Sequence, residues 1–231
     1  MKTVLVTGGT RGIGLSTALK FKEDGWNVYI TSRKQENLDA VLEDHSNLKG
    51  FVARADDLSA ATETCESIVS DTGSLDVLIN NAGTGFRRDV EQLNIDDFLH
   101  VYNTNVFGLS ILTKEIIPNM KKQKKGTIIN IGSTASLKGY KGGSIYASSK
   151  FAVRALTQCW QAELRPYNIR VCQINPSEVP TAFANKERIE RKNIENKLTT
   201  KEIAHAITSA IEMDDRGFIN ELNVWATNPF N

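Results

Sequence analysis

The sequence predicts an α/β fold in which helices cover both faces of a doubly wound parallel sheet of about seven strands. Two observations support this prediction. Short apolar or β-branched runs alternate with longer stretches of helical spacing, as parallel strands joined by helical crossovers require. A glycine-rich segment follows the first run directly, where such folds place a ligand-binding turn. Neither a repeat nor a change of composition divides the 231 residues, so we expect a single domain over residues 1–231.

The apolar runs that predict strands are spread along the whole chain. The clearest helical pattern follows Ser144, where apolar residues form one stripe. The last predicted helix starts at Thr199, which forms a capping box with Glu202, and it runs to about Met213. The predicted strands are residues 3–7, 28–31, 51–53, 77–79, 127–131, 169–174 and 222–225.

Composition disfavours several classes of function. The 28 Lys and Arg residues nearly balance 27 Asp and Glu residues, so no overall field attracts nucleic acid or an anionic membrane. The basic run at 121–125 is interpreted as a solvated turn after a helix. The three cysteines have neither disulfide nor metal-ligand spacing, and the first apolar run is too short for a secretory signal. We therefore expect a cytoplasmic protein with no metal site and no membrane span.

The segment "TGGTRGIG", residues 7–14, has the context of a phosphate-binding turn because it joins the first predicted strand to the first helix. Gly8 and Gly12 would let the backbone turn and approach a pyrophosphate, and Gly14 would let helix and strand pack closely. The helix N-terminus supplies N–H donors. The spacing differs from the common G-x-G-x-x-G, and glycine turns also occur for steric reasons alone. In this context we interpret the segment as the dinucleotide site of a Rossmann-like fold.

The end of the second predicted strand indicates which dinucleotide binds. An acidic residue about 20 positions beyond the glycines would bind a free ribose 2′-hydroxyl. Here the chain has Ser32 and Arg33, with no Asp or Glu before Glu36, and Arg11 lies in the glycine turn itself. Two guanidinium groups and a hydroxyl suit a 2′-phosphate, so we expect NADP (NADPH) to be preferred over NAD. The alternative is that both arginines are solvated surface residues.

The segment "YASSK" places Tyr146 and Lys150 on one face of a helix, since residues four apart are neighbours there. A phenol of pKa about 10 is a poor acid–base group at neutral pH, and a nearby ammonium would lower that pKa. Tyr146 would then exchange a proton with a carbonyl or an alcohol, while Lys150 bonds ribose hydroxyls. Taken alone, such a pair is more often plain helix surface.

Ser133 makes the catalytic interpretation stronger, because it lies just past a predicted strand and 13 residues before Tyr146. The carboxyl ends of parallel strands are where open α/β sheets bind ligands, so its hydroxyl can bond the same carbonyl oxygen. Thr134 would point the other way if the chain is still extended there. Ser136 and Ser144 are candidates only if the loop is arranged differently.

These segments together resemble the short-chain dehydrogenase/reductase family over nearly the whole chain. Each motif is weak alone, but their joint order and spacing are specific. The motifs are "TGGTRGIG" (7–14), "DDL" (56–58), "NNAG" (80–83), "NTN" (103–105), "GS" (132–133), "YASSK" (146–150) and "NPSEVPT" (175–181).

The resemblance implies a catalytic tetrad of Ser133, Tyr146, Lys150 and Asn105, with hydride transfer between nicotinamide and substrate. Asn105 matches a residue that supports a helix kink and a proton relay to the lysine; an Asn that breaks the helix without a catalytic role is the alternative. Asn80 is expected to brace the central strand. The positions matched to cofactor contacts are Gly8, Thr10, Arg11, Gly12, Ile13, Gly14, Ser32, Arg33, Asp57, Leu58, Asn81, Ala82, Gly83, Tyr146, Lys150, Val179 and Thr181.

The chain departs from the family pattern after the sixth strand, where Ser177 stands in place of the usual glycine and Pro180 is added. Serine tolerates a left-handed backbone less well than glycine, so this loop, over residues 176–181, is expected to follow another path. Residues 182–198 occupy the place of the family's substrate lid and are short and charged. A small pocket is expected, with these residues as candidates to line it: Phe86, Leu137, Tyr140, Phe183 and Ile189.

The leading hypothesis is an NADP-dependent oxidoreductase acting on a carbonyl or secondary alcohol, with a 3-oxoacyl thioester as the first substrate class. Three alternatives stay open: a dinucleotide-sensing protein without turnover, a dehydrogenase of a small sugar, polyol or aldehyde, and an epimerase or dehydratase on the same fold. The resemblance also implies a homodimer or homotetramer. Basic residues of the lid suggest an acyl-carrier protein as a partner, although solvation explains such charges more often.

Overall fold

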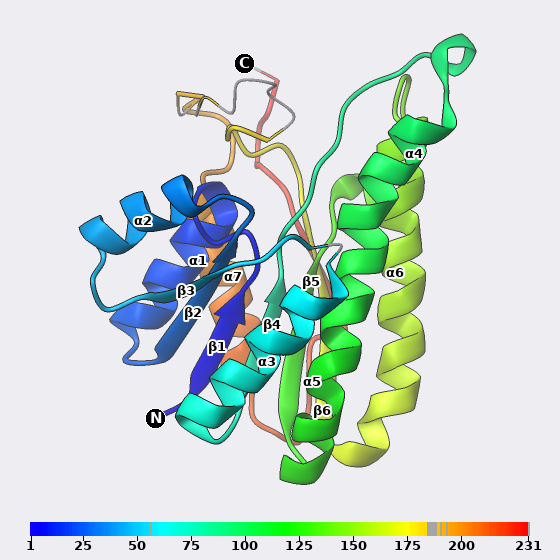
Figure 1. Cartoon of the computed structure of the whole chain (residues 1–231). Coiled ribbons are helices and arrows are strands. Elements are labelled where there is room, and N and C mark those ends of the chain that lie inside the picture. Colours follow the sequence, from blue (N-terminus) through cyan, green and yellow to red (C-terminus); the bar gives the residue numbers. More distant parts are fainter. Residues whose placement is uncertain (56, 184–188, 190, 193, 231) are drawn as a thin grey trace.

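The structure, a computed structural model, describes residues 1–55, 57–183, 189, 191–192 and 194–230. Its centre is a parallel seven-stranded sheet of order β3-β2-β1-β4-β5-β6-β7 (Figure 1). The chain first winds outward from β1 to β3 and then returns to start the second half beside β1, which makes the sheet doubly wound. The strands are β1 (Thr3–Val6), β2 (Asn27–Ser32), β3 (Lys49–Val52), β4 (Val77–Asn80), β5 (Gly126–Ile131), β6 (Ile169–Pro176) and β7 (Glu221–Val224).

Helices cover both faces of the sheet, as predicted (Figure 1). One face packs α1, α2 and α7, and the other packs α3, α5 and α6. The helices are α1 (Gly12–Glu23), α2 (Gln35–Asp44), α3 (Leu58–Thr72), α4 (Ile95–Tyr102), α5 (Leu109–Gln123), α6 (Ser144–Leu164) and α7 (Thr200–Glu212). Short 3-10 turns are η1 (Val90–Gln92), η3 (Thr134–Ser136) and η4 (Arg165–Tyr167), and η2 (Asn103–Gly108) is a π-helix.

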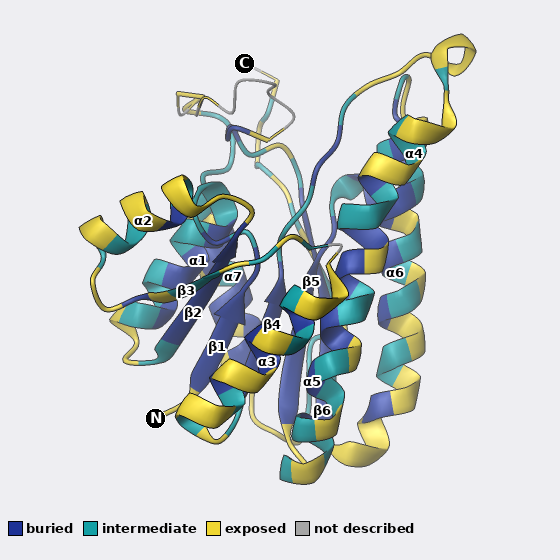
Figure 2. Cartoon of the chain, viewed as in Figure 1, coloured by how far each residue is buried: buried dark blue, intermediate teal, exposed yellow. Residues whose placement is uncertain are grey.

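The central strands are buried on both faces, which explains why they read as continuous apolar runs. Along β1, Val4 and Val6 face the cluster under α1 and α7, whereas Leu5 faces the cluster under α3 and α5. Figure 2 shows this arrangement as buried strands between helices whose outer faces are exposed. The two apolar clusters therefore hold one rigid sheet between two helical layers.

The parallel register brings the carboxyl ends of all strands to one edge of the sheet. Asn80 of β4 pairs with Asn130 of β5, and Ile131 of β5 pairs with Ile174 of β6. β1 lies between β2 and β4, so the two halves of the sheet meet there. Open α/β sheets bind ligands beyond the carboxyl edge at this point. The fold thus gathers the loops after β1, β4, β5 and β6.

All seven predicted strands are confirmed to within two residues at each end. The third begins at Lys49 rather than at residue 51, so Gly50 belongs to the strand. Gly50 packs under α2, where an added Cβ would come within 2.4 Å of Leu38. The predicted last helix is also confirmed, with its capping box between Thr199 and Glu202.

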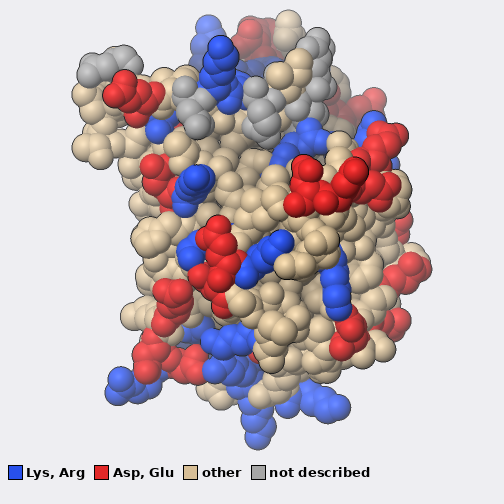
Figure 3. Space-filling view, turned by 90° about the vertical axis from the view of Figure 1, so that its left-hand side faces the viewer, with Lys and Arg blue, Asp and Glu red and all other residues tan. Residues whose placement is uncertain are grey.

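The surface agrees with a nearly neutral sequence. Figure 3 shows Lys and Arg interspersed with Asp and Glu over one face of the molecule. The basic run 121–125 lies where α5 ends and β5 begins, with Lys124 in a left-handed conformation at the helix C-terminus. In the described part of the chain, no helix has both the length and the apolar content needed to cross a membrane. Much of the predicted lid, residues 182–198, lies outside the described residues.

Candidate active site

The glycine turn after β1 has the geometry that a phosphate-binding turn needs. Gly8 and Gly12 have φ angles of 62° and 54°, which side-chain-bearing residues rarely adopt. A Cβ on Gly14 would lie 2.4 Å from the carbonyl oxygen of Gly8, so helix α1 can approach the turn only with glycine there. The first turn of α1 contains no acidic side chain. Its free N–H groups and the positive end of the helix dipole can therefore bind an anion.

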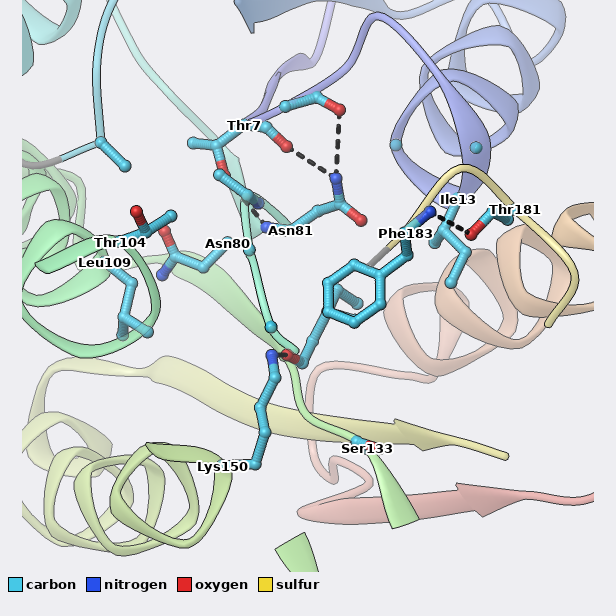
Figure 4. A pocket seen from close by; sticks show the side chains of 18 of the residues that line it. Thr7, Ile13, Asn80, Asn81, Thr104, Leu109, Ser133, Lys150, Thr181 and Phe183 are labelled. Atoms are coloured by element: carbon cyan, nitrogen blue, oxygen red, sulfur yellow. Dashed lines mark hydrogen bonds between the residues drawn. The ribbon is translucent and has the colours of Figure 1, made fainter. Parts of the chain in front are cut away.

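Asn81, just after β4, fixes the glycine turn from the side. Its Nδ2 donates to the carbonyl oxygens of Thr7 at 2.8 Å and Gly8 at 3.2 Å. The hydroxyl of Thr7 accepts from the backbone N–H groups of Asn81 at 3.0 Å and Ala82 at 2.9 Å. Figure 4 shows these contacts between Thr7 and Asn81 above the cavity. The β1 and β4 loops are therefore held together as one wall.

A cleft of about 2020 Å³ runs along the carboxyl edge of the sheet. It is larger than the ~300–1,000 Å³ of a typical small-molecule pocket, so it has room for a dinucleotide and a substrate together. Among the described residues that line it, Glu178 is the only carboxylate. The predicted residues that line it are Gly8, Thr10, Arg11, Gly12, Ile13, Gly14, Ser32, Arg33, Asn81, Ala82, Gly83, Ser133, Tyr146, Lys150, Val179 and Thr181.

Two residues matched to adenine contacts do not line this cleft. Asp57 instead caps helix α3, where its carboxylate accepts from the N–H of Ala60 at 3.1 Å. Leu58 is 52% exposed as the first residue of that helix. Neighbouring residues that the sequence reasoning missed, Ala53, Arg54 and Ala55, line the cleft instead. The segment after β3 thus reaches the cleft with residues earlier than the matched pair.

Tyr146 and Ser133 come from different elements and meet in the cleft. Tyr146 is half-buried in the first turn of α6, and Ser133 follows β5 as the N-cap of η3. Burial raises the pKa of Tyr146, and a hydrogen bond with the Ser133 hydroxyl opposes this shift. The expectation of a lowered pKa is therefore not met in this structure, because burial outweighs the hydrogen bond. Thr134 and Ser136 belong to η3, and Ser136 hydrogen-bonds the backbone N–H of Ser133 at 3.2 Å.

Lys150 lies one helical turn beyond Tyr146 and reaches into the cavity (Figure 4). Its side chain is buried, and Nζ donates to the carbonyl oxygen of Ile131 at 2.7 Å. Nζ lies 5.8 Å from the centre of the Tyr146 ring. Burial lowers the pKa of Lys150 to about 8. At neutral pH the ammonium form still predominates, so the group remains a cationic donor at the floor of the cleft.

Asn105 stands behind the cleft in η2, the π-helical segment between α4 and α5. Its side chain is buried and bonds Thr84 twice, accepting from N–H and donating to the carbonyl, each at 2.8 Å. Its Nδ2 also donates to the Ser149 hydroxyl at 3.1 Å. Ser149 in turn donates to the carbonyl oxygen of Tyr146 at 2.7 Å. π-helical segments mark functional sites frequently, and here Asn105 joins the β4 loop to α6.

Comparison with known proteins agrees with this geometry. The sequence profile of the family described as short chain dehydrogenase matches residues 2–192. The chain belongs to the short-chain dehydrogenase/reductase family. It is an oxidoreductase of that family that acts on CH–OH groups.

Two relatives in the family illustrate its range. The chain is 33% identical to the 3-oxoacyl-[acyl-carrier-protein] reductase of Thermotoga maritima over 189 residues, 80% of this chain and 77% of the relative. It is also 33% identical to the NADP-dependent 3-hydroxy acid dehydrogenase of Schizosaccharomyces pombe over 225 residues, 91% of this chain and 86% of the relative.

Solved structures of the family have the same fold. An alcohol dehydrogenase from Thermococcus sibiricus, complexed with 5-hydroxy-NADP, superposes with a TM-score of 0.90 at 23% identity, covering 98% of this chain and 97% of the other. A serine dehydrogenase complexed with NADP+ gives a TM-score of 0.87 at 29% identity, with 96% and 94% covered.

A nicotinamide dinucleotide fits the cleft of this short-chain dehydrogenase/reductase. At the glycine turn, the positive φ angles and the missing Cβ of Gly14 leave the backbone accessible to a pyrophosphate. Ser32 and Arg33 line the end of the cleft by β2, while Tyr146 and Lys150 line the part beyond β5. The elements that a dinucleotide requires are thus spread along one continuous cleft.

The loop after β6 accommodates Ser177 without strain. Ser177 is not among the described residues with positive φ, so a left-handed backbone is not needed there. Its N–H donates to the carbonyl oxygen of Val224 at 2.8 Å, and its hydroxyl accepts from the N–H of Ala226 at 3.3 Å. The serine therefore ties this loop to the end of β7.

Beyond Ser177, the loop returns to the cleft. Thr181 is buried, and its Cγ2 lies 3.4 Å from the position that a Cβ on Gly12 would occupy. Phe183 lies beside Tyr146, with ring centres 5.5 Å apart, and stands over the cavity in Figure 4. Of the five residues expected to line a small pocket, Phe86, Tyr140 and Phe183 line the cleft.

Proposed function

We propose that this protein is an NADP-preferring oxidoreductase that interconverts a carbonyl compound and its secondary alcohol, with a 3-oxoacyl thioester as the substrate class. The observation that carries the proposal is that Ser133 and Tyr146, from different elements, line the same cleft with the Ser133 hydroxyl close enough to lower the pKa of the Tyr146 phenol. Both line the same cleft as the glycine turn, so a carbonyl oxygen placed between them also lies near the cofactor site.

The residues divide the chemistry among them. NADPH, when bound, supplies the hydride. Tyr146 donates the proton to the substrate oxygen, and burial keeps its phenol protonated at neutral pH, as a proton donor requires. Ser133 bonds the same oxygen and orients it. Lys150 presents an ammonium group to the ribose hydroxyls, and Asn105 supports α6 through Ser149.

The substrate class is supported by relatives and by the shape of the cleft. One relative is named as a 3-oxoacyl-[acyl-carrier-protein] reductase and another as a 3-hydroxy acid dehydrogenase. Both names describe oxygen chemistry at the third carbon of an acyl chain. Phe86, Tyr140 and Phe183 give the cleft aromatic walls that suit a short acyl chain. We retain residues 182–198 as the proposed lid over this part.

The direct test of function is NADPH oxidation against a panel of 3-oxoacyl thioesters, 3-oxo acids, simple ketones, aldehydes and keto sugars. We expect the fastest turnover with a 3-oxoacyl thioester. Turnover of only a sugar or aldehyde would replace the substrate class but keep the reaction type. Tight binding of NADPH without oxidation of any panel member would instead support a dinucleotide-sensing protein.

Arg33 is proposed to bind the 2′-phosphate of NADP. Arg33 lines the cleft beside Ser32 and Lys34, with no carboxylate among the described lining residues at that end. We expect Arg33→Ala to raise KM for NADPH about ten- to hundredfold, the loss of one or two charge-assisted hydrogen bonds, and KM for NADH less than twofold. Arg216→Ala, which removes an exposed arginine paired with Asp214, is the control. Equal effects on both cofactors would show that Arg33 has only a structural role.

A homodimer or homotetramer is proposed from exposed apolar side chains on neighbouring helices. Leu99 in α4, Phe107 in η2 and Phe151 in α6 are each 43–48% exposed. An apolar surface of this kind is typical of a subunit interface. We expect light scattering at micromolar concentration to give at least twice the mass of one 25.6 kDa chain, and Phe151→Glu to lower it. A monomeric mass for the unaltered protein would contradict the proposal.

A cytoplasmic location and an acyl-carrier protein partner complete the proposal. The three cysteines are free thiols, which fits a reducing compartment. An acyl-carrier protein would present the thioester substrate, and its interaction is tested by comparing KM for thioesters of that protein and of coenzyme A.

A further inference from the structure

A chain of buried side-chain hydrogen bonds crosses the sheet beneath the active site. Asn80 in β4 donates to Asn130 in β5 at 2.9 Å, and Asn130 donates to Thr157 in α6 at 2.8 Å. The single hydroxyl proton of Thr157 is shared between the carbonyl of Val153 at 2.8 Å and Oε1 of Gln173 in β6 at 3.3 Å. Gln173 donates to Oδ1 of Asn175 at 2.7 Å. All five side chains are at most 4% exposed. Burying polar groups is costly unless they find partners. Among the described residues, only Oδ1 of Asn80 in this hydrogen-bond network lacks one.

Asn175 is where this chain reaches the active site. Its Oδ1 accepts from Gln173 and from the backbone N–H of Ser133 at 3.2 Å, an N–H that Oγ of Ser136 also accepts at 3.2 Å. Asn175 is fully buried and does not line the cleft. A Cβ on Gly132 would come within 2.1 Å of Oδ1, so the amide packs directly against the backbone before Ser133. Asn175 therefore contacts the main chain of Ser133 but cannot touch a ligand in the cleft.

The other end of the Asn175 amide is held by β7. Its Nδ2 donates to Oε1 of Glu221 at 2.7 Å and to Oδ1 of Asn223 at 2.9 Å. A carboxylate can only accept and the Ser133 N–H can only donate, so these two partners fix the amide orientation. Alanine would remove every one of these contacts.

Glu221 also binds helix α6, which contains Tyr146. Its Oε2 accepts from Nη2 of Arg154 at 2.9 Å and from Nε at 3.2 Å. Arg154 lies in α6, four residues beyond Lys150 and eight beyond Tyr146, on the same helix face. Ser133 and α6 are thus both tied to one carboxylate through side chains outside the cleft.

We propose that Asn175 is a positioning residue that sets Ser133 at its distance from Tyr146, with Glu221 and Arg154 as the anchor. This inference rests on the proposed function, since it assigns Asn175 a role through Ser133. A shift of about 1 Å in a reacting group can lower a rate about a hundredfold, so a single hydrogen bond to the Ser133 main chain is sufficient to matter.

The test is a double-mutant cycle on the substrate found with the panel. We expect Asn175→Ala to lower kcat at least about tenfold while Kd for NADPH changes less than twofold. In a Ser133→Ala background the same substitution should lower kcat no further, because its target is already lost. Asn130→Ala is the matched control, since it removes a buried amide of the same chain that does not contact Ser133. It should lower the melting temperature but keep kcat within about twofold.

A polarity-exchanged variant separates positioning from packing. In the double variant Asn175→Asp, Glu221→Gln, a carboxylate oxygen at position 175 still accepts from the Ser133 N–H. Between β6 and β7 the direction is reversed, since the amide at position 221 now donates to the carboxylate at position 175. We expect kcat within about threefold of the unaltered protein. A measurement without substrate is hydrogen–deuterium exchange of a peptide containing Ser133. Asn175→Ala should speed exchange there about fivefold or more, and Asn130→Ala should not.

The outcomes separate the two proposals. If Ser133→Ala keeps full kcat, the proposed role of Ser133 is wrong. If Ser133→Ala is impaired but Asn175→Ala is not, or if the two losses multiply, the positioning role is wrong and the proposed function stands. Should Asn175→Ala not fold, a polarity-exchanged variant that folds but is as slow as Ser133→Ala would overturn the positioning role alone.

Discussion

We expect Tyr146→Phe to lower kcat about a thousandfold, within the range of about 10²–10⁴ for loss of a general acid, and to leave NADPH binding nearly unchanged. The substitution removes only the phenol hydroxyl, whose pKa the neighbouring Ser133 hydroxyl lowers. The aromatic ring remains to pack against Gly85 and Phe183, so the cleft keeps its shape. The measurement is steady-state NADPH oxidation, together with fluorescence titration of NADPH. The expected pattern is a large fall in kcat with a change in Kd below threefold.

Tyr140→Phe provides a matched control. Tyr140 lines the same cleft, and the guanidinium of Arg87 lies over its ring, 5.7 Å from the ring centre. Removing its hydroxyl keeps this contact, so we expect kcat to stay within about threefold. Equal losses in the two variants would mean that any hydroxyl in the cleft matters in the same way. Wild-type turnover by Tyr146→Phe would show that another group delivers the proton.

Lys150→Met is expected to have the second largest effect, lowering kcat about a hundredfold and weakening NADPH binding at least tenfold. Methionine fills a similar volume but cannot donate a hydrogen bond, so the ribose hydroxyls lose their cationic donor. The same titration and kinetic assays measure both effects. A fall in kcat with unchanged Kd would assign Lys150 to chemistry alone and contradict its proposed contact with the cofactor.

Lys150 also makes stability depend on pH in a defined direction. Burial lowers its pKa from 10.5 to about 8, so between about pH 8 and 10.5 the unfolded chain holds a proton that the folded chain has lost. The free energy of unfolding therefore rises with pH between about pH 8 and 10.5. Below about pH 8 the buried ammonium lowers the free energy of unfolding by its full amount. Relative to Lys150→Met, the unaltered protein should gain up to about 3 kcal/mol from pH 7 to pH 10.5, by chemical denaturation without cofactor. A flat difference would show that the ammonium is not destabilised by burial.

The fold was predictable because its signals are local. Parallel strands in the middle of a sheet are covered on both faces and are therefore mostly apolar; β1, β4 and β5 are buried at every residue. β3 starts two residues before its predicted start, because Gly50 fits under Leu38 of α2 and so belongs to the strand. The exact end of a strand thus depends on a contact with a distant residue.

In the candidate site, too, residues in local motifs were predictable and residues defined by distant contacts were not. The glycine turn, Ser133, Tyr146 and Lys150 carry recognisable spacing, and the structure brings them to one cleft. Asp57, matched to an adenine contact, also caps helix α3, a role that an aspartate before any helix can have. The adenine contacts of Asp57 and Leu58 stay a prediction.

Two supporting residues carried no signal of their contacts, although both lie in matched motifs. Ser149 lies within "YASSK", and Asn175 is the first residue of "NPSEVPT". Their roles depend on Asn105, 44 positions from Ser149, and on Ser133, 42 positions from Asn175. Only the three-dimensional fold brings such pairs together.

The most direct test of the account is deuterium transfer from NADPH labelled at C4 of the nicotinamide, in both stereochemical forms, to the carbonyl compounds of the panel. One of the two labelled forms should yield a secondary alcohol with one deuterium at the former carbonyl carbon, over many turnovers, and Tyr146→Phe should slow this product about a thousandfold. Binding of labelled NADPH with no deuterated alcohol from any panel member would contradict the proposed carbonyl reduction.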